Sequence, residues 1–189
     1  FAARRSLQPI KNLVDRVLAD CWVLTGGCAA IQRWFVKLGT PAIVVNSARD
    51  DGVLPCLGGD NRALAHHAVG LFLARGHRRI ALLTPRPDRM DHDPICEGFV
   101  EAFRFNREHA NIEPRLLYHN ETISGVRSAL ETQFRSKTPP DALLVVRPKH
   151  TLTAMSCLMN LGLRLPRDVA LISAGYLPIL DGMVPSVAH

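Results

Sequence analysis

Short apolar segments alternate with amphipathic segments along the chain, and this alternation constrains the fold more than any other feature. Apolar residues at i, i+3, i+4 and i+7 predict helices, whereas short apolar runs between turn residues predict buried strands. Strands that alternate with helices form βαβ units, in which the strands pair in parallel. The predicted strands span residues 21–25, 41–45, 53–57, 79–83, 116–118, 142–146 and 169–172. The sequence therefore predicts an α/β fold with doubly wound parallel sheets.

Residues with known preferences for helix ends mark the same alternation. Asp60 is a candidate N-cap for a helix that ends near Gly76, and Asp93-Pro94 supply an N-cap and a first helical residue for the next. The side chains expected on the buried faces of these two helices are Leu64, Ala68, Leu71 and Phe72 in the first, and Phe99, Ala102 and Phe103 in the second.

The helix predicted over residues 152–161 carries two apolar stripes. One consists of Ala154, Leu158 and Leu161, and the other of Leu152, Met155 and Met159. A helix that lies on a sheet needs only one such stripe. We therefore expect the second stripe to contact another element of the chain or another copy of it.

The chain is long enough for one domain or two small lobes, and its composition argues against a membrane protein. It has 189 residues, of which 47% are hydrophobic and 21% are charged. No apolar run approaches the roughly 18 residues that a membrane helix needs. Residues 1–5 contain a basic pair without an apolar stretch behind it, so they do not predict a signal peptide. We expect no membrane partner.

Charge bears on whether this chain itself binds DNA, and cysteine content bears on its cellular compartment. The net charge is +6, but Lys and Arg are scattered, and the cluster His77-Arg78-Arg79 is too short for a DNA-binding surface. The five cysteines form no CxxC pair, and Cys21, Cys56 and Cys157 lie in apolar segments, where a reduced thiol behaves as a small hydrophobe. A reducing, cytoplasmic location is therefore favoured.

Motifs that carry enzyme chemistry are absent from the sequence. It contains no GxSxG elbow, GxxxxGK[ST] loop, GxGxxG turn or HExxH pair. Asp88, Asp91, His92 and Asp93 are close in sequence, but no second cluster accompanies them, so they are interpreted as a charged loop. We expect neither catalysis nor a cofactor or metal ion.

Three segments together resemble the lactose-repressor (LacI/GalR) family of bacterial transcription regulators. The first is Gly-Gly-Asp-Asn at residues 58–61 followed by Gly-His-Arg-Arg-Ile-Ala at 76–81, and the second is Glu-Gly-Phe-Val-Glu-Ala-Phe at 97–103. The third is Pro-Asp-Ala at 140–142 followed by Gly-Leu-Arg-Leu-Pro-Arg-Asp-Val at 162–169. Their order and spacing across the whole chain make the resemblance specific.

The resemblance implies the effector-binding core of such a regulator, with a fold of the type I periplasmic-binding-protein kind. Its two doubly wound lobes would comprise residues 1–77 and 78–176, and residues 177–189 would begin the crossover back to the first lobe. It also implies a homodimer, an unknown small-molecule effector in the cleft between the lobes, and operator DNA bound by a helix-turn-helix headpiece that this chain lacks. On this interpretation the chain is truncated at both ends.

The sequence departs from the family where family members carry polar ligand-binding groups. Family members carry an Arg three residues before the Gly-Phe motif, an Asp or Asn after the strand that follows Pro-Asp-Ala, and an Asp after a later strand. This chain has Ile95, Pro148 and Gly175 there. Since a sugar pocket relies on such groups for its hydrogen bonds, we expect an effector other than a neutral hexose held in the usual way.

Polar residues remain at the ends of several predicted strands and are the candidate ligand-binding residues. Among them Arg147 stands out, because a cation directly after an apolar strand often meets an anion at a cleft. An alternative for each residue is an ordinary solvated loop. The candidates are Thr25, Asn46, Ser47, Thr84, Arg86, Arg147 and Tyr176.

The candidate dimer interface combines the second stripe of the helix at 152–161 with an apolar segment near the C-terminus. It consists of Leu152, Met155, Met159, Leu177, Ile179 and Leu180. The rival interpretation of the whole chain is a periplasmic sugar-binding protein of a transport system, which shares the fold. The segment preceding Phe1 in the gene, a helix-turn-helix or a signal peptide, would distinguish the two.

Overall fold

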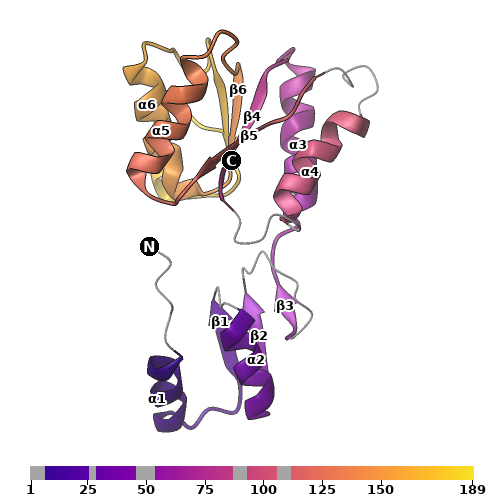
Figure 1. The fold of residues 1–189 in the computed structure, drawn as a ribbon, viewed down its shortest axis with the longest axis vertical. Coiled ribbons are helices and arrows are strands. Elements are labelled where there is room, and N and C mark those ends of the chain that lie inside the picture. The colour runs from indigo at the N-terminus through magenta and orange to yellow at the C-terminus, as the bar shows by residue number, and fades with distance from the viewer. Residues whose placement is uncertain (1–6, 26–28, 46–53, 87–92, 106–111) are drawn as a thin grey trace. The chain divides into compact units, whose positions relative to one another are not determined.

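The computed structural model describes residues 7–25, 29–45, 54–86, 93–105 and 112–189. The chain divides into two compact units, residues 1–59 and 60–189, each with its own parallel sheet. Figure 1 shows the elements of both units. The predicted α/β class with parallel sheets is confirmed.

The first unit has three parallel strands in the order β1-β2-β3. Phe35 packs its ring against Trp22 and Trp34, with ring centroids 5.9 and 5.0 Å away, and is buried together with Ile31 and Val44. The elements are α1 (Gln8–Arg16), β1 (Trp22–Thr25), α2 (Ala29–Leu38), β2 (Ala42–Val45) and β3 (Cys56–Leu57).

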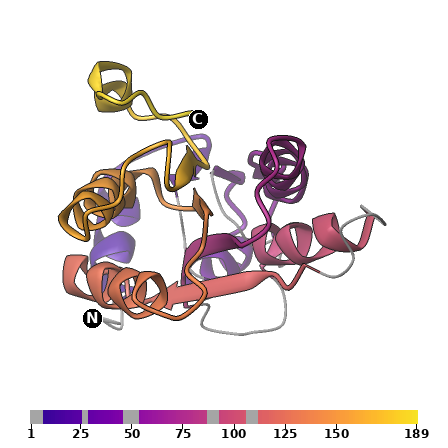
Figure 2. The same cartoon turned by 90° about the horizontal axis from the view of Figure 1, so that it is seen from above.

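The second unit has four parallel strands in the order β5-β4-β6-β7, covered by helices on both faces. In Figures 1 and 2, α3 and α4 lie on one face of the sheet and α5 and α6 on the other. The elements are α3 (Asn61–Ala74), β4 (Ile80–Pro85), α4 (Pro94–Phe105), β5 (Arg115–His119), α5 (Ile123–Phe134), β6 (Ala142–Val145), α6 (Thr151–Asn160) and β7 (Ala170–Ser173), with short 3-10 turns at η2 (Pro148–His150) and η3 (Pro178–Gly182).

Successive residues of β4 and β6 alternate between two apolar cores, as residues of a strand buried on both faces must. Ala81 and Leu83 belong to the cluster on the side of α5 and α6. Ile80 and Leu82 belong to the cluster that contains the buried residues of α3 and α4. All four are fully buried, which explains why these strands are continuously apolar in the sequence.

Helix α3 belongs to the second unit, so the boundary lies before it and not after residue 77 as predicted. Asp60 caps α3 as expected, since its carboxylate accepts a hydrogen bond from the backbone N–H of Ala63. The helix buries Val69 and Phe72 in the same cluster as Phe99 of α4. The two helices therefore share a core, and the second unit starts eighteen residues earlier than the predicted start at residue 78.

The close packing of α3 on α4 explains the glycine of the Glu-Gly-Phe motif. A Cβ added at Gly98 would lie 2.5 Å from the carbonyl oxygen of Arg62, well inside van der Waals contact. Arg62 on α3 also forms an ion pair with Glu101 on α4, at the exposed edge of the same contact. The motif is therefore a packing feature.

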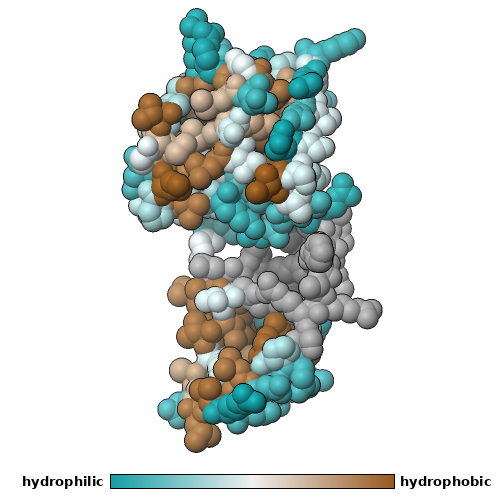
Figure 3. Space-filling view, turned by 90° about the vertical axis from the view of Figure 1, so that its left-hand side faces the viewer, coloured by the Kyte–Doolittle hydropathy of each residue, from teal (hydrophilic) through white to brown (hydrophobic). Residues whose placement is uncertain are grey.

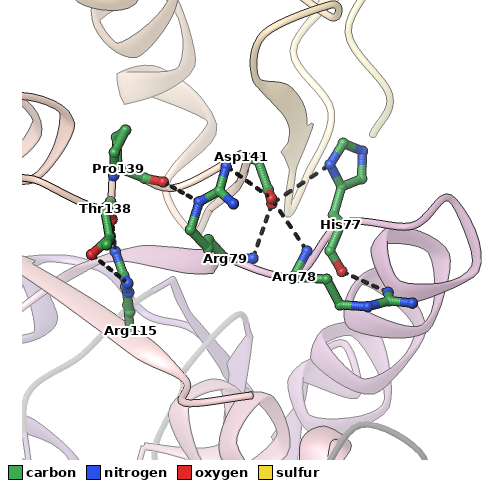
Figure 4. A network of polar contacts seen from close by, with 7 residues as sticks. All are labelled: His77, Arg78, Arg79, Arg115, Thr138, Pro139 and Asp141. Carbon is green, nitrogen blue, oxygen red and sulfur yellow. Dashed lines mark hydrogen bonds and ion pairs between the residues drawn. The ribbon is translucent and has the colours of Figure 1, made fainter. Parts of the chain in front are cut away.

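The Gly-His-Arg-Arg and Pro-Asp-Ala motifs meet at the amino-terminal edge of the second sheet, as Figure 4 shows. The carboxylate of Asp141 accepts hydrogen bonds from the backbone N–H groups of Arg78 and Arg79, at 3.3 and 3.1 Å. It also forms an ion pair with the guanidinium of Arg79 at 3.4 Å, and its Oδ1 lies 3.6 Å from Nδ1 of His77. Asp141 thus ties the start of β4 to the start of β6.

Two further expectations concern the cysteines and the membrane. Cys157 is buried in the core as expected, but Cys21 and Cys56 are exposed, because each lies at the start of a strand in the small first unit. Cys28 lies outside the described residues. Within the part of the chain that the structure describes, no helix is long and apolar enough to span a bilayer.

Candidate functional site

The strand order of the second unit marks one position on its sheet as a place for ligands. From β4 the chain passes to β5 on one side, and from β5 it returns to β6 on the other side of β4. The connections that leave the carboxyl ends of β4 and β6 therefore diverge. In open parallel sheets, this change of direction leaves a crevice in which ligands bind.

Three candidate residues are brought to this position, and a fourth lies beside it. Arg86 follows β4 and Arg147 follows β6, and both side chains are exposed. Thr84 lies at the end of β4 but is fully buried. Tyr176 follows β7, is 54% exposed, and donates a hydrogen bond of 2.7 Å to the carboxylate of Asp181.

The remaining candidate ligand residues belong to the first unit. Thr25 is the last residue of β1 and is exposed. Asn46 and Ser47 lie outside the described residues. Their participation in a site remains a prediction.

Sequence reasoning missed a pair of buried histidines at the same carboxyl edge. His119 ends β5 and His150 ends the turn η2 after β6, and each ring is 4% exposed. The rings meet edge to face, with centroids 4.8 Å apart. Neither histidine is part of a recognisable sequence motif. One available signal was that His119 directly follows a strand of the predicted sheet.

The environment of the two histidines favours their neutral forms. His119 Nδ1 accepts a hydrogen bond from the backbone N–H of Glu121 at 3.0 Å, which leaves the proton of the neutral ring on Nε2. Nε2 of both rings is buried without a hydrogen-bond partner among the described residues. Burial and the neighbouring His150 lower the pKa of His119 to about 4, and burial with the positive charge of Lys149 lowers the pKa of His150.

An ion-paired carboxylate stands next to the histidines. Glu121 has a backbone φ of 61°, which is uncommon for a residue with a side chain. One oxygen of its carboxylate lies 3.3 Å from Arg147 Nε and 3.9 Å from Lys149 Nζ. The loop after β5 therefore contacts the loop after β6, across the end of β4.

The three positions at which the sequence departs from the LacI/GalR pattern are apolar in structure as well. Ile95 is 3% exposed and belongs to the core shared by α3 and α4, so it does not reach a ligand. A Cβ added at Gly175 would lie 2.9 Å from Cγ of Pro148. Pro148 therefore occupies the space that a side chain at residue 175 would need.

A hollow of about 560 Å³ opens beside the carboxyl end of β5, a size common for small-molecule sites. Arg86, Tyr118, His119 and Asn120 line it near the strand end, and Ser128 and Thr132 of α5 line it further along. Among the described residues, no group of three or more His, Cys, Asp or Glu side chains could hold a metal ion.

The candidate dimer residues differ in exposure. Met155 and Leu180 are buried, at 2% and 1%, so they are unavailable to a partner chain; Met155 packs in the core on the side of α5 and α6. Met159 and Ile179 are each 55% exposed, and Leu152 and Leu177 are half-buried. The second stripe of α6 therefore contributes to the core at Met155 and to the surface at Met159.

Comparison with known proteins places the chain among relatives that regulate transcription. The periplasmic binding protein-like domain matches residues 69–187. The HTH-type transcriptional repressor CytR of Escherichia coli K12 is 26% identical over 137 residues, which is 70% of this chain and 38% of the repressor. The chain thus spans well under half the length of that relative. As expected, the relatives found are regulators and not enzymes.

Solved structures show the same fold. A LacI family transcriptional regulator from Mycobacterium smegmatis matches with a TM-score of 0.81 at 21% identity, covering 98% of this chain and 69% of the other. A regulatory protein of the LacI family from Chloroflexus aggregans matches with a TM-score of 0.80 at 21% identity, covering 99% and 68%. The chain belongs to the periplasmic binding protein-like domain family, and the predicted resemblance to the effector-binding cores of LacI-type regulators is confirmed.

Proposed function

We propose that this chain is the effector-binding and dimerisation core of a bacterial LacI-type transcription regulator. A small molecule bound at the carboxyl edge of the second sheet would modulate binding to operator DNA. The DNA contact would come from a helix-turn-helix headpiece outside this chain, since CytR carries the description HTH-type repressor.

The observation that carries the proposal is the set of groups at the switch point of the second sheet. Arg86 and His119 line the hollow along α5, His150 packs against His119, and Arg147 pairs with Glu121. A ligand that prefers one arrangement of the protein shifts its population toward that arrangement. Such a shift would change DNA affinity without any contact between ligand and DNA.

Dimerisation is supported by apolar side chains that the unit leaves exposed. Figure 3 shows hydrophobic patches among hydrophilic ones on the face where α5 and α6 lie. Met159 on α6 and Ile179 in η3 are the members of the predicted interface with the greatest exposure. A symmetric dimer through these residues would bury surface that water now covers.

DNA binding is tested by fluorescence anisotropy of labelled DNA from upstream of the gene, at about 150 mM salt, a concentration that screens non-specific phosphate contacts. The full-length protein is expected to bind one site selectively, and residues 1–189 alone to show only weak, salt-sensitive binding. Selective binding by residues 1–189, or none by the full-length protein, would contradict the proposal.

Dimerisation is tested separately by sedimentation of the same full-length protein. Met159→Lys is expected to shift the dimer toward monomer without lowering its unfolding midpoint, because the side chain is 55% exposed. Asn160→Lys, also exposed on α6 but about 100° around the helix from Met159, serves as the charge-matched control. A monomeric wild type at micromolar concentration would contradict the dimer.

A further inference from the structure

Two cations at the carboxyl edge of the second sheet share a single carboxylate. Arg147 and Lys149 both approach Oε1 of Glu121, at 3.3 and 3.9 Å. About half of each of these side chains is exposed, so solvent and dissolved ions reach all three. An exposed pair of this kind contributes little to stability and is exchanged easily for another partner.

The backbone holds Glu121 in this place. Its φ of 61° lies in the left-handed region, and its N–H donates to Nδ1 of the buried His119. This conformation directs the Glu121 carboxylate from the loop after β5 toward the cations of the loop after β6. The strained backbone is maintained at the position where the strand order favours a ligand.

The charges around this position favour an anion. Arg86 adds a third cation at the end of β4, and the neutral His119 adds a buried Nε2–H donor without an acceptor among the described residues. Among the described residues, the first carboxylate after β4 is that of Asp93, just before α4, and one of its oxygens accepts the backbone N–H of Ile95 at 3.3 Å. Among these described residues, cations and N–H donors outnumber carboxylates, the reverse of what a metal cation needs.

We propose that the ligand of this site is a small anion. Its carboxylate or phosphate group would bind Arg147 and Lys149 in the position that the Glu121 carboxylate occupies without ligand, and would displace Glu121. The location of the site rests on the proposed function, whereas the chemical class of the ligand rests on the charges described above. The apolar Ile95, Pro148 and Gly175 agree with this class, because they remove groups that would bind neutral hydroxyls.

Isothermal titration calorimetry at low salt tests the ligand class with four probes: inorganic phosphate, citrate, glucose 6-phosphate and glucose. Wild-type protein is expected to bind at least one anion and not glucose. Arg147→Gln is expected to weaken anion binding about tenfold or more, because charge-assisted hydrogen bonds are lost. Glu121→Gln is expected to strengthen it by about threefold to fivefold, since the competing carboxylate is removed.

The ion pair between Arg127 and Glu131 on α5 provides matched controls. Arg127 Nη2 lies 3.6 Å from Glu131 Oε1, and both side chains are exposed to an extent similar to those of Arg147 and Glu121. Arg127→Gln and Glu131→Gln are expected to leave anion affinity within about twofold, the scale of an exposed charge at a distance. The preference among phosphate, citrate and glucose 6-phosphate distinguishes a phosphate ligand from a carboxylate ligand.

The inference is overturned by anion binding that Arg147→Gln leaves unchanged, by weaker binding to Glu121→Gln, or by glucose binding in place of anions. None of these results affects DNA binding by the full-length protein, on which the proposed function is tested. Conversely, loss of DNA binding in that protein leaves the calorimetric result standing. The two failures are therefore distinguishable.

Discussion

Protonation of the buried histidine pair is expected to destabilise the second unit as the pH falls. The pKa of His119 is about 4 in the folded chain, against an ordinary value of 6.5. Between these values the unfolded chain binds a proton that the folded chain does not, so stability falls as the pH is lowered through this window. The difference corresponds to about 3 kcal/mol for His119 at about pH 4, at 1.36 kcal/mol per pKa unit.

The surrounding charges agree with this direction. Lys149 and Arg147 disfavour a protonated ring, whereas the Glu121 carboxylate favours it, and burial is the largest cause of the lowered pKa. His150 shifts in the same direction, also chiefly through burial, so its protonation adds to the loss. Above about pH 6.5 both rings are neutral in either state and contribute no pH dependence.

Urea unfolding at a series of pH values measures the effect, and two signals separate the units. Trp22 and Trp34 are the two tryptophans of the chain and both lie in the first unit, so their fluorescence reports on that unit alone. Far-UV circular dichroism reports on the helices of both units. The pH-dependent loss is expected in the circular dichroism transition and not in the fluorescence transition.

His119→Asn is the informative variant, because the amide oxygen of Asn can replace Nδ1 as acceptor for Glu121 N–H without titrating. The variant is expected to lose about 3 kcal/mol less than wild type between about pH 6.5 and about pH 4. His77→Asn removes a half-buried histidine elsewhere in the unit as the control. Equal pH dependence in wild type and His119→Asn would refute the reasoning.

Four other substitutions test the packing of the second unit through urea unfolding. Asp141→Ala is expected to cost about 2 to 4 kcal/mol, because two backbone N–H groups lose their acceptor; a loss under about 0.5 kcal/mol would contradict its role. Gly98→Ala is expected to destabilise by about 1 to 3 kcal/mol through the clash with Arg62, whereas Gly70→Ala on α3, with open space around it, is expected to stabilise by up to about 1 kcal/mol. Phe99→Ala is expected to cost about 3 to 5 kcal/mol in unfolding free energy, since the ring is fully buried.

The sequence predicted the elements well because their patterns are local. Strands β4, β6 and β7 of the second sheet are mainly apolar in sequence, and Asp60 is an N-cap as its position indicated. Which face of a helix is buried was harder to predict. Leu71 shares a periodic stripe with Phe72 but is 36% exposed, because the stripe of Ala65, Ala68, Val69 and Phe72 faces α4.

The unit boundary illustrates a limit of motifs. Gly76 does end a helix and adopts a φ of 88°, as its place before a strand indicated. A helix end, however, does not say on which sheet the helix lies. That is decided by packing between residues far apart in sequence, here Phe72 of α3 and Phe99 of α4.

The candidate site was predicted only in part for the same reason. Strand ends identified Arg86 and Arg147, because the carboxyl ends of parallel strands meet at one edge. His119 and His150 come together only through the order β5-β4-β6, which brings two separate loops together over the end of β4. Glu121 was missed because a loop carboxylate has no pattern of its own until its backbone conformation is known.

The structure also explains why a charged side chain is disfavoured at residues 95 and 175. A carboxylate at residue 175 would collide with Pro148, whose Cγ lies 2.9 Å from the position of the missing Cβ. A guanidinium at residue 95 would be buried in the core of α3 and α4, where Ile95 is 3% exposed and an unpaired charge is costly. A polar side chain at either position would therefore strain the fold, at residue 175 through contact with Pro148 and at residue 95 through burial. The proposed anion would therefore be recognised by Arg147 and Lys149, the described cations after β6.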